Sequence, residues 1–184
     1  QKSLDVCATI DFNGFTVTVQ VGDGTYTGAI IVPVTVGQAG VGNFILQGNS
    51  GTPANVLIST TSADCVTCGA CARITVKDLE LRTTTSGFTI NVTGGGASLA
   101  WSNIRFGACA WSHILAQAGG MALNSGNYAI SGAAQRHLHA SHGGIVQASN
   151  STITISGTPT FSSTFADASQ GIIRAFTNTY SGSA

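Results

Sequence analysis

A nine-residue stretch of the chain repeats itself 24 residues later. Ser112–Gly120 (SHILAQAGG) returns as Arg136–Gly144 (RHLHASHGG), with a histidine, an aliphatic residue, an alanine and two glycines in matching places. Glycines that open a run recur in the same way, at Gly96, Gly120, Gly144 and Gly171. A fixed period between about 20 and 50 residues is typical of a solenoid, in which each structural unit stacks on the next.

Each repeat also has a polar corner that leads into a short apolar or threonine-rich run. The corner residues in register are Asp78, Asn103, Asn127, Ser151 and Asn178. The runs are too short for helices, and many are rich in Val, Ile and Thr. A unit with three short strands and three turns is one coil of a parallel β-helix, stacked at about 4.8 Å. We therefore predict an all-β, single-stranded, right-handed parallel β-helix with about 24 residues per coil and at most about seven coils.

Stacking places like residues on like. The first predicted inward column is Ile90, Ile114, Leu138 and Phe165, and the second is Val92, Ala116 and Ala140. Trp101 aligns with Val76 and is expected to point inward too. Asparagine tolerates the left-handed conformation at a tight corner, and its amide can bind the next coil. We interpret the corner asparagines as a structural ladder.

The chain divides into residues 1–12, a capping helix segment, and residues 13–184, one β-helix domain. Gln1–Ile10 has the pattern of an amphipathic helix, with Leu4, Cys7 and Ala8 on one side. Such a helix would cover the unpaired edge of the first coil. The early coils are expected to be irregular, with about 27 to 30 residues each, compared with about 24 residues in the later coils. Because Tyr180–Ala184 stops in mid-pattern, we expect a further segment or a sister chain to cover the other end.

Composition excludes several partners. Charged residues are 8% of the chain, against roughly 25% in ordinary domains, and the formal net charge is zero. A basic patch is absent, which disfavours nucleic acid. The sequence has neither an apolar run of about 18 residues nor a signal peptide, so we expect no membrane span. We predict no cofactor. A mean hydropathy of +0.29 indicates that part of the outward surface is covered, most simply by sister chains.

A family resemblance accompanies these patterns. Thr16–Tyr26 (TVTVQVGDGTY) resembles the opening strand and turn of pectate-lyase-like right-handed β-helices. With Ile45–Asn49 (ILQGN), Thr52–Val56 (TPANV) and Ile104–Gly107 (IRFG), the chain is similar to β-helical proteins of tailed bacteriophages. In those proteins the module lies in a tail spike, tail fibre or head spike. The resemblance implies a homotrimer on the virion surface that meets bacterial surface polysaccharide. Its motifs are structural, so they indicate the fold better than the activity.

Cys65, Cys68 and Cys71 form a C-x-x-C-x-x-C run, and Cys7 and Cys109 lie elsewhere. A zinc site needs four ligands, and an iron–sulfur motif would need a fourth cysteine and a proline. The odd count disfavours a complete disulfide framework. We interpret the cysteines as small core residues, with Cys65 in the column of Ile90 and with Cys68 and Cys71 near a turn. One disulfide or a metal remains an alternative.

Strand alternation places His113, His137 and His139 outward on one face, with Leu115 beside them. Neighbouring rings would lie about 4.8 to 6.6 Å apart, which suits a metal or an acidic sugar. The adjacent leucine favours a subunit contact instead, and plain exposure is a third alternative. Trp111 follows a loop and is a candidate glycan-binding ring, although packing would also explain it.

Asp78 and Glu80 are the one candidate catalytic dyad, two residues apart on one strand. Glycoside hydrolysis needs two carboxyl groups about 5 to 9.5 Å apart, and this spacing gives about 6.6 Å. With Lys77 and Arg82 alongside, a solvated charge pair is the favoured interpretation. We therefore predict a non-catalytic structural or receptor-contacting spike module. A polysaccharide-degrading spike is one alternative. The other is an ice-binding or adhesive solenoid based on threonines such as Thr16, Thr18 and Thr83–Thr85.

Overall fold

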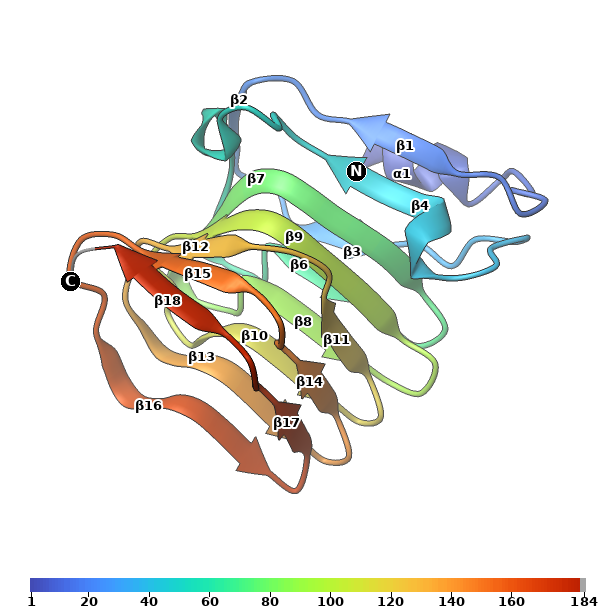
Figure 1. The fold of residues 1–184 in the computed structure, drawn as a ribbon. Helices are drawn as coiled ribbons and strands as arrows, with labels where there is room; N and C mark the ends of the chain where they lie inside the picture. The colour runs from blue at the N-terminus through green and yellow to red at the C-terminus, as the bar shows by residue number, and fades with distance from the viewer. Residues whose placement is uncertain (183–184) are drawn as a thin grey trace.

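The computed structural model describes residues 1–182 and is a parallel β-solenoid of about seven turns, with about 25 residues per turn (Figure 1). One short helix, α1 (Lys2–Cys7), precedes the strands. The predicted fold class is confirmed. The last two residues of the expected domain, 183 and 184, lie outside the described part. Within that part, no helix is long and apolar enough to cross a bilayer.

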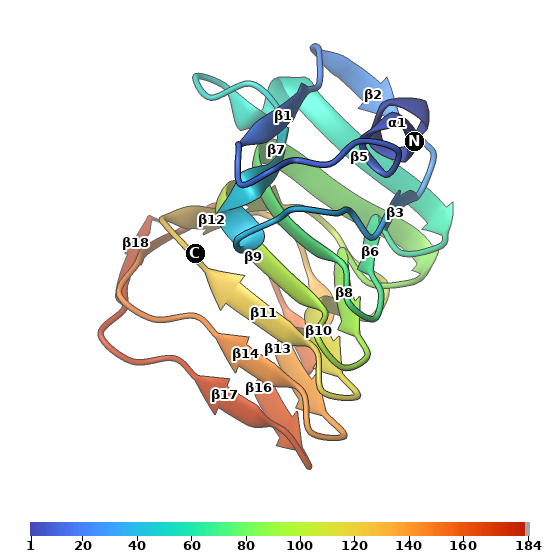
Figure 2. The ribbon, with the colours of Figure 1, turned by 90° about the vertical axis from the view of Figure 1, so that its right-hand side faces the viewer.

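Three faces run along the solenoid (Figures 1 and 2). Face 1 stacks β1 (Val17–Gln20), β4 (Phe44–Gln47), the first part of β7 (Arg73–Ser86), the first part of β9 (Ser98–Phe106), β11 (Met121–Asn124), β14 (Ile145–Gln147) and β17 (Ile172–Arg174). Face 2 stacks β2 (Gly24–Tyr26), β5 (Val56–Ser62), the second parts of β7 and β9, β12 (Tyr128–Ile130), β15 (Thr152–Ile155) and β18 (Thr179–Gly182). Face 3 stacks β3 (Ile30–Val32), β6 (Val66–Cys68), β8 (Ile90–Thr93), β10 (Ser112–Gln117), β13 (Ala134–Ser141) and β16 (Phe161–Ser169). Two short 3₁₀ turns, η1 (Val41–Asn43) and η2 (Pro53–Asn55), interrupt the early coils.

The register of face 3 confirms most of the predicted columns. Ile114 pairs with Ile90 on one side and with Leu138 on the other, and all three are buried. The prediction for Phe165 is wrong, because Leu138 pairs with Ala166. A register shift between Ala134 and Arg136 displaces β16 along β13. Phe165 still packs against the core, although it does not continue the column.

The polar corners between faces 1 and 2 form the predicted ladder. Asp78 and Asn103 have left-handed backbone, with φ of 62° and 48°. The Asn103 side-chain Nδ2 donates to Asp78 Oδ1 at 2.8 Å in the preceding coil. At later corners Asn127 Oδ1 accepts from the Thr152 backbone N–H at 2.8 Å, and Asn178 Oδ1 accepts from that of Ser151 at 3.1 Å. The ladder therefore turns each coil and ties it to its neighbour.

The N-terminal segment caps the first coil, as predicted. Leu4 and Cys7 of α1 are buried in the same core cluster as Phe12. The ring of Phe12 meets that of Phe44 edge-on, with centroids 5.5 Å apart. Trp101 is fully buried and pairs with Val76, as its alignment indicated.

Candidate functional site

His113 and His137 point into the core, so the prediction that they face outward is wrong. Both are fully buried, as are the residues that follow them, Ile114 and Leu138. Two successive side chains are therefore buried within β10 and within β13, so the strict alternation of a regular strand fails at the histidine. Both imidazoles lie 5.4 Å from the ring of Phe106, between centroids, inside the solenoid.

Hydrogen bonds join these histidines into one directional chain. His113 Nε2 lies 2.9 Å from the Gly107 carbonyl oxygen, which can only accept, so Nε2 carries the proton. The unprotonated Nδ1 of His113 then accepts from His137 Nδ1–H at 3.1 Å. His137 Nε2 is left to accept from the Tyr128 hydroxyl at 3.1 Å. This chain of hydrogen bonds fixes both tautomers and uses all four ring nitrogens, so no ring nitrogen remains for a metal.

Burial keeps both imidazoles neutral. It lowers the pKa of His113 to about 4, and burial together with the neighbouring His113 lowers the pKa of His137 well below its ordinary value. Among residues 1–182, no group of three or more His, Cys, Asp or Glu side chains could hold a metal ion. The pair is therefore a structural element of the core.

The hydrogen-bond chain predicts opposite tautomers for the two rings. Nitrogen–proton correlation NMR of uniformly ¹⁵N-labelled protein at pH 7.5 should show His113 protonated at Nε2 and His137 at Nδ1. The Tyr128→Phe variant should leave the His113 tautomer in place, because it removes only the donor to His137 Nε2. Finding both rings protonated at Nε2 would contradict this arrangement of hydrogen bonds.

Of the predicted outward residues, His139 and Trp111 reach the surface. His139 is half-buried on β13, and its pKa is lowered by burial and then by the charge of Arg136. Leu115, its partner in the register, is only 3% exposed, so the chain itself covers it without a sister chain. Trp111 is 43% exposed before β10, and its ring meets Phe88 edge-on at 5.1 Å. The structure does not assemble these residues with His113 and His137 into one surface site.

All five cysteines are free thiols, and four are buried. Cys68 ends β6 and Cys71 lies in the turn that follows, as predicted, and Cys68 also pairs with Val92 in an inward column. Cys65 is buried but lies one residue before the predicted position, since Val66 is the residue that pairs with Ile90. Burial raises the pKa of Cys65 to about 11 and that of Cys68 to about 12. These thiols act as small core residues.

Only Cys71, exposed in a turn, should react in the folded protein. Iodoacetamide at pH 8 is expected to add one label to the native chain and five after denaturation, counted by intact-mass spectrometry. The thiolate is the reactive form, and burial disfavours it at the other four positions. Replacing Cys71 with serine should abolish native labelling. Rapid labelling of Cys65 or Cys68 would contradict the burial of these two thiols.

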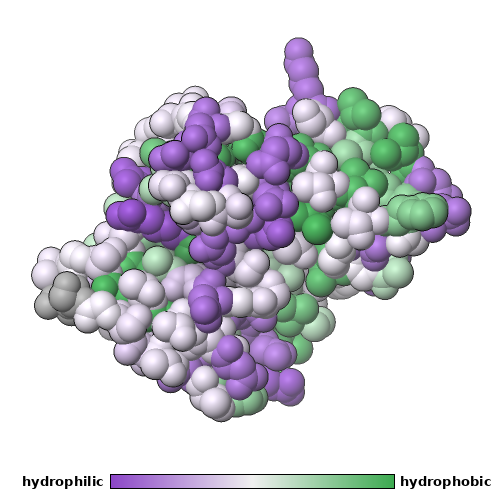
Figure 3. Space-filling model, turned by 45° about the horizontal axis from the view of Figure 1, so that its top comes forward, coloured by the Kyte–Doolittle hydropathy of each residue, from purple (hydrophilic) through white to green (hydrophobic). Residues whose placement is uncertain are grey.

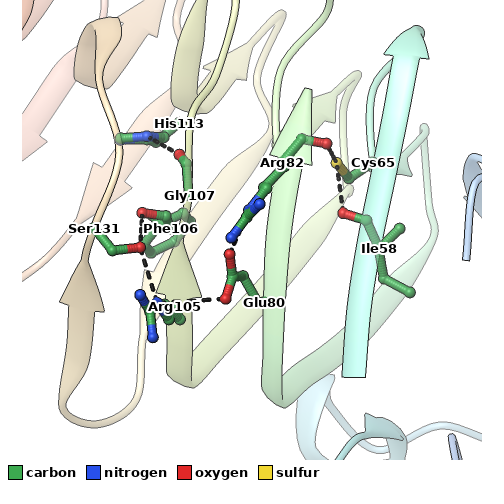
Figure 4. A network of polar contacts seen from close by, with 9 residues as sticks. All are labelled: Ile58, Cys65, Glu80, Arg82, Arg105, Phe106, Gly107, His113 and Ser131. Atoms are coloured by element: carbon green, nitrogen blue, oxygen red, sulfur yellow. Dashed lines mark hydrogen bonds and ion pairs between the residues drawn. The ribbon is translucent and has the colours of Figure 1, made fainter. Parts of the chain in front are cut away.

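Asp78 and Glu80 are both buried, so the prediction that they are solvated is wrong, whereas the predicted charge pairing with Lys77 and Arg82 is present. The Asp78 oxygens accept from Asn103 and, at 2.9 Å, from Gln47 Nε2, and Lys77 Nζ lies 3.9 Å away. Glu80 is covered by two arginines. Figure 4 shows its carboxylate between Arg82, whose Nε lies 2.5 Å from Oε1, and Arg105, whose Nε lies 3.3 Å from Oε2. All four carboxylate oxygens thus face donors or cations of the chain itself.

A groove of about 320 Å³ lies on face 2 beside this cluster. One wall is the loop Gly51–Ala54, which precedes β5. Its other lining residues come from stacked strands and their corners: Asn103, Ile104, Arg105, Asn127, Tyr128, Ala129 and Thr154. The Asn49 side chain holds the loop by accepting from the backbone N–H groups of Gly51 at 3.1 Å and Thr52 at 3.0 Å.

The corner amides of this groove, Asn103 and Asn127, were recognised from the sequence, whereas Arg105 was not. The signal for Arg105 was its offset of 25 residues from Glu80, which becomes a contact once the coils stack. Arg105 is the residue that links the groove to the buried carboxylate.

No protein-family model, curated protein or solved structure matches the chain. The class of protein is therefore defined by the fold, a capped parallel β-solenoid with a polar groove on one face.

Proposed function

We propose that the protein is a structural, receptor-contacting module of a bacteriophage spike or fibre, and that it meets bacterial surface polysaccharide on the virion as a homotrimer. The groove on face 2 carries the proposal. Its side-chain amides, hydroxyl and guanidinium match the hydroxyl-rich surface of a glycan, and they stand on strands held in register on both sides. A rigid platform of this kind binds without first having to be ordered.

Exposed apolar side chains support self-association. Those at the N-terminal end of the solenoid are Val6, Ile10, Phe15, Ile31, Val34 and Val36, and Phe15 alone is 71% exposed. Figure 3 shows the apolar surface gathered over the end that carries α1 and β1. A large exposed apolar patch marks an interface in a soluble protein. We assign this patch to contact between copies of the chain.

The resemblance of Thr16–Tyr26 and Ile104–Gly107 to phage β-helices also supports the proposal. Degradation of polysaccharide is a weaker candidate, since Asp78 and Glu80 are bound by the chain's own side chains. An ice-binding surface is weaker too, because Thr83 is buried and its hydroxyl donates to the Gly87 carbonyl oxygen.

Light scattering and a bacterial glycan array test the proposal together. We expect a particle of three times the 18.6 kDa chain mass, and binding to one or more surface polysaccharides without release of reducing ends. The Phe15→Ser, Val36→Ser double variant should dissociate while remaining folded, because it makes two exposed positions polar. A wild-type monomer would overturn the trimer. Cleavage of the bound glycan would overturn the non-catalytic assignment, and absence of binding across the array would overturn glycan contact.

A further inference from the structure

We propose that Arg82 and Arg105 form a preorganised binding site for an oxyanion carried by an acidic glycan. That the ligand is a glycan rests on the proposed function. That the site selects an oxyanion goes beyond the proposed function, because it names the chemical group that is bound.

The first argument is charge. Glu80 contributes one negative charge, against two positive charges from the arginines, which leaves the cluster with a surplus of one. Glu80 is 2% exposed, whereas the side chains of Arg82 and Arg105 are 45% and 42% exposed. The carboxylate is buried beneath its partners, so the surplus positive charge is presented to solvent.

The second argument is geometry. Leu79, Leu81 and Phe106 are buried in the core, so alternation directs Glu80, Arg82 and Arg105 to the outside of face 2. Each guanidinium contacts Glu80 through Nε, and Arg105 Nε also donates to Ser131 Oγ at 2.9 Å (Figure 4). Within residues 1–182, the terminal nitrogens of both arginines make no hydrogen bond. These nitrogens are the donors available to a ligand.

The third argument is that the backbone makes room for this arrangement. Gly107 follows Phe106, the partner of Leu81, and so lies beside Arg82. A Cβ at position 107 would lie 2.5 Å from Arg82 Cγ, 2.8 Å from its Nε and 3.0 Å from Glu80 Oε1. Any larger residue would displace the arginine from the carboxylate. The glycine therefore allows Arg82 to lie across Glu80.

A guanidinium presents paired N–H donors that match a carboxylate or phosphate group. Two such groups already fixed by Glu80 lose little side-chain freedom when an oxyanion binds. The groove lies beside Arg105, so a sugar whose charged group meets the arginines can place its ring against Asn127 and Ala129. The Arg136–Asp167 pair on face 3 is the internal comparison. Its single arginine faces one carboxylate at 2.8 Å and has no surplus charge.

Chemistry on the ligand side tests the site without altering the protein. Binding is measured by calorimetry to polygalacturonate, alginate, hyaluronan and a phosphate-bearing teichoic acid. Each uronate polymer is compared with its methyl ester. At least one acidic polymer is expected to bind about tenfold or more tightly than its neutral form, as loss of charge-assisted hydrogen bonds implies. The uronate and teichoic acid arms distinguish carboxylate from phosphate as the natural group.

Variants then locate the site. Arg105→Gln should weaken binding by about tenfold, and Arg105→Lys should weaken it nearly as much, because lysine keeps the charge but not the planar fork. Arg136→Gln, the matched control, should bind as wild type. Removing Arg105 leaves Glu80 buried with one partner, so circular dichroism must confirm that the variant is folded. The Glu80→Gln, Arg105→Gln double variant removes that buried charge and should show the same loss of affinity, about tenfold.

The outcomes separate the two proposals. Equal binding of acidic and neutral polymers would overturn the oxyanion site and leave glycan contact standing. Inorganic phosphate that shifts the Arg82 and Arg105 Nε–H signals, with no polymer bound, would support the oxyanion site and overturn glycan contact. If neither polymers nor phosphate bind, the site is overturned. Equal losses in the Arg105→Gln and Arg136→Gln variants would also overturn it, because binding would then follow net charge.

Discussion

Replacing Gly144 with alanine is expected to destabilise the protein by at least about 3 kcal/mol, at the upper end of the cost of overpacking a core. A Cβ at this position would lie 2.2 Å from the Ala116 carbonyl oxygen, 2.3 Å from its carbon and 2.6 Å from the Gln117 nitrogen. These are backbone atoms of the preceding coil. The clash is relieved only if two stacked coils separate, which would break the hydrogen bonds between them.

The adjacent glycine is the control. Gly143 has a φ of +76°, and a Cβ there would meet nothing within 4 Å. Alanine at this position incurs only the strain of the left-handed conformation, about 1 to 2 kcal/mol. Urea unfolding followed by circular dichroism measures both variants. Equal destabilisation at 143 and 144 would contradict the close approach of the coils at Gly144.

Acidification from pH 6.5 to 4.5 should destabilise the folded protein by about 2 kcal/mol through His113, at up to 1.36 kcal/mol per pH unit, and His137 should add to the loss in the same direction. Their folded pKa values are depressed below the unfolded value, so the unfolded chain binds protons first as the pH falls. The stabilisation is complete above about pH 6.5, the unfolded pKa, and is lost as the pH approaches the folded values. The surroundings supply no compensating charge, since Phe106, Tyr128, Phe161 and Phe165 pack against the rings.

Urea unfolding at half-unit pH intervals measures how the free energy of unfolding changes with pH. The His113→Phe, His137→Phe double variant should lose most of this pH dependence, whereas the His142→Gln variant, changed at an exposed position, should keep it. If the double variant does not fold, the wild-type imidazole NMR signals decide the matter. Those of His113 and His137 should remain in the neutral form at pH 5. Titration of either ring near pH 6.5 in the folded protein would contradict the buried chain.

The fold could be predicted because the structural repeat of a solenoid also appears as a repeat of fixed length in the sequence. The 24-residue repeat placed Ile114 between Ile90 and Leu138, and the corner asparagines marked where each coil turns. Errors arose where local geometry departs from the period. The alternation rule put His113 outside although both His113 and Ile114 are buried in β10, and Phe165 was misplaced because β16 shifts its register.

The candidate site was less accessible from the sequence. Glu80 and Arg82 were recognised as neighbours along one strand, but the burial of Glu80 depends on Arg105 from the next coil. Space for Arg82 depends on Gly107, and the groove depends on a loop that folds against strands far along the chain. Each requirement joins segments that lie from one to about four coils apart. They become visible together only when the coils are stacked.

The most direct test of glycan recognition by face 2 is a crystal structure of the protein soaked with an oligogalacturonate. We expect the carboxylate of one sugar within hydrogen-bond distance of the terminal nitrogens of both Arg82 and Arg105, with the adjoining ring in the groove beside Asn127. A sugar bound instead against Trp111 or Arg136, with the two arginines unliganded, would contradict this recognition.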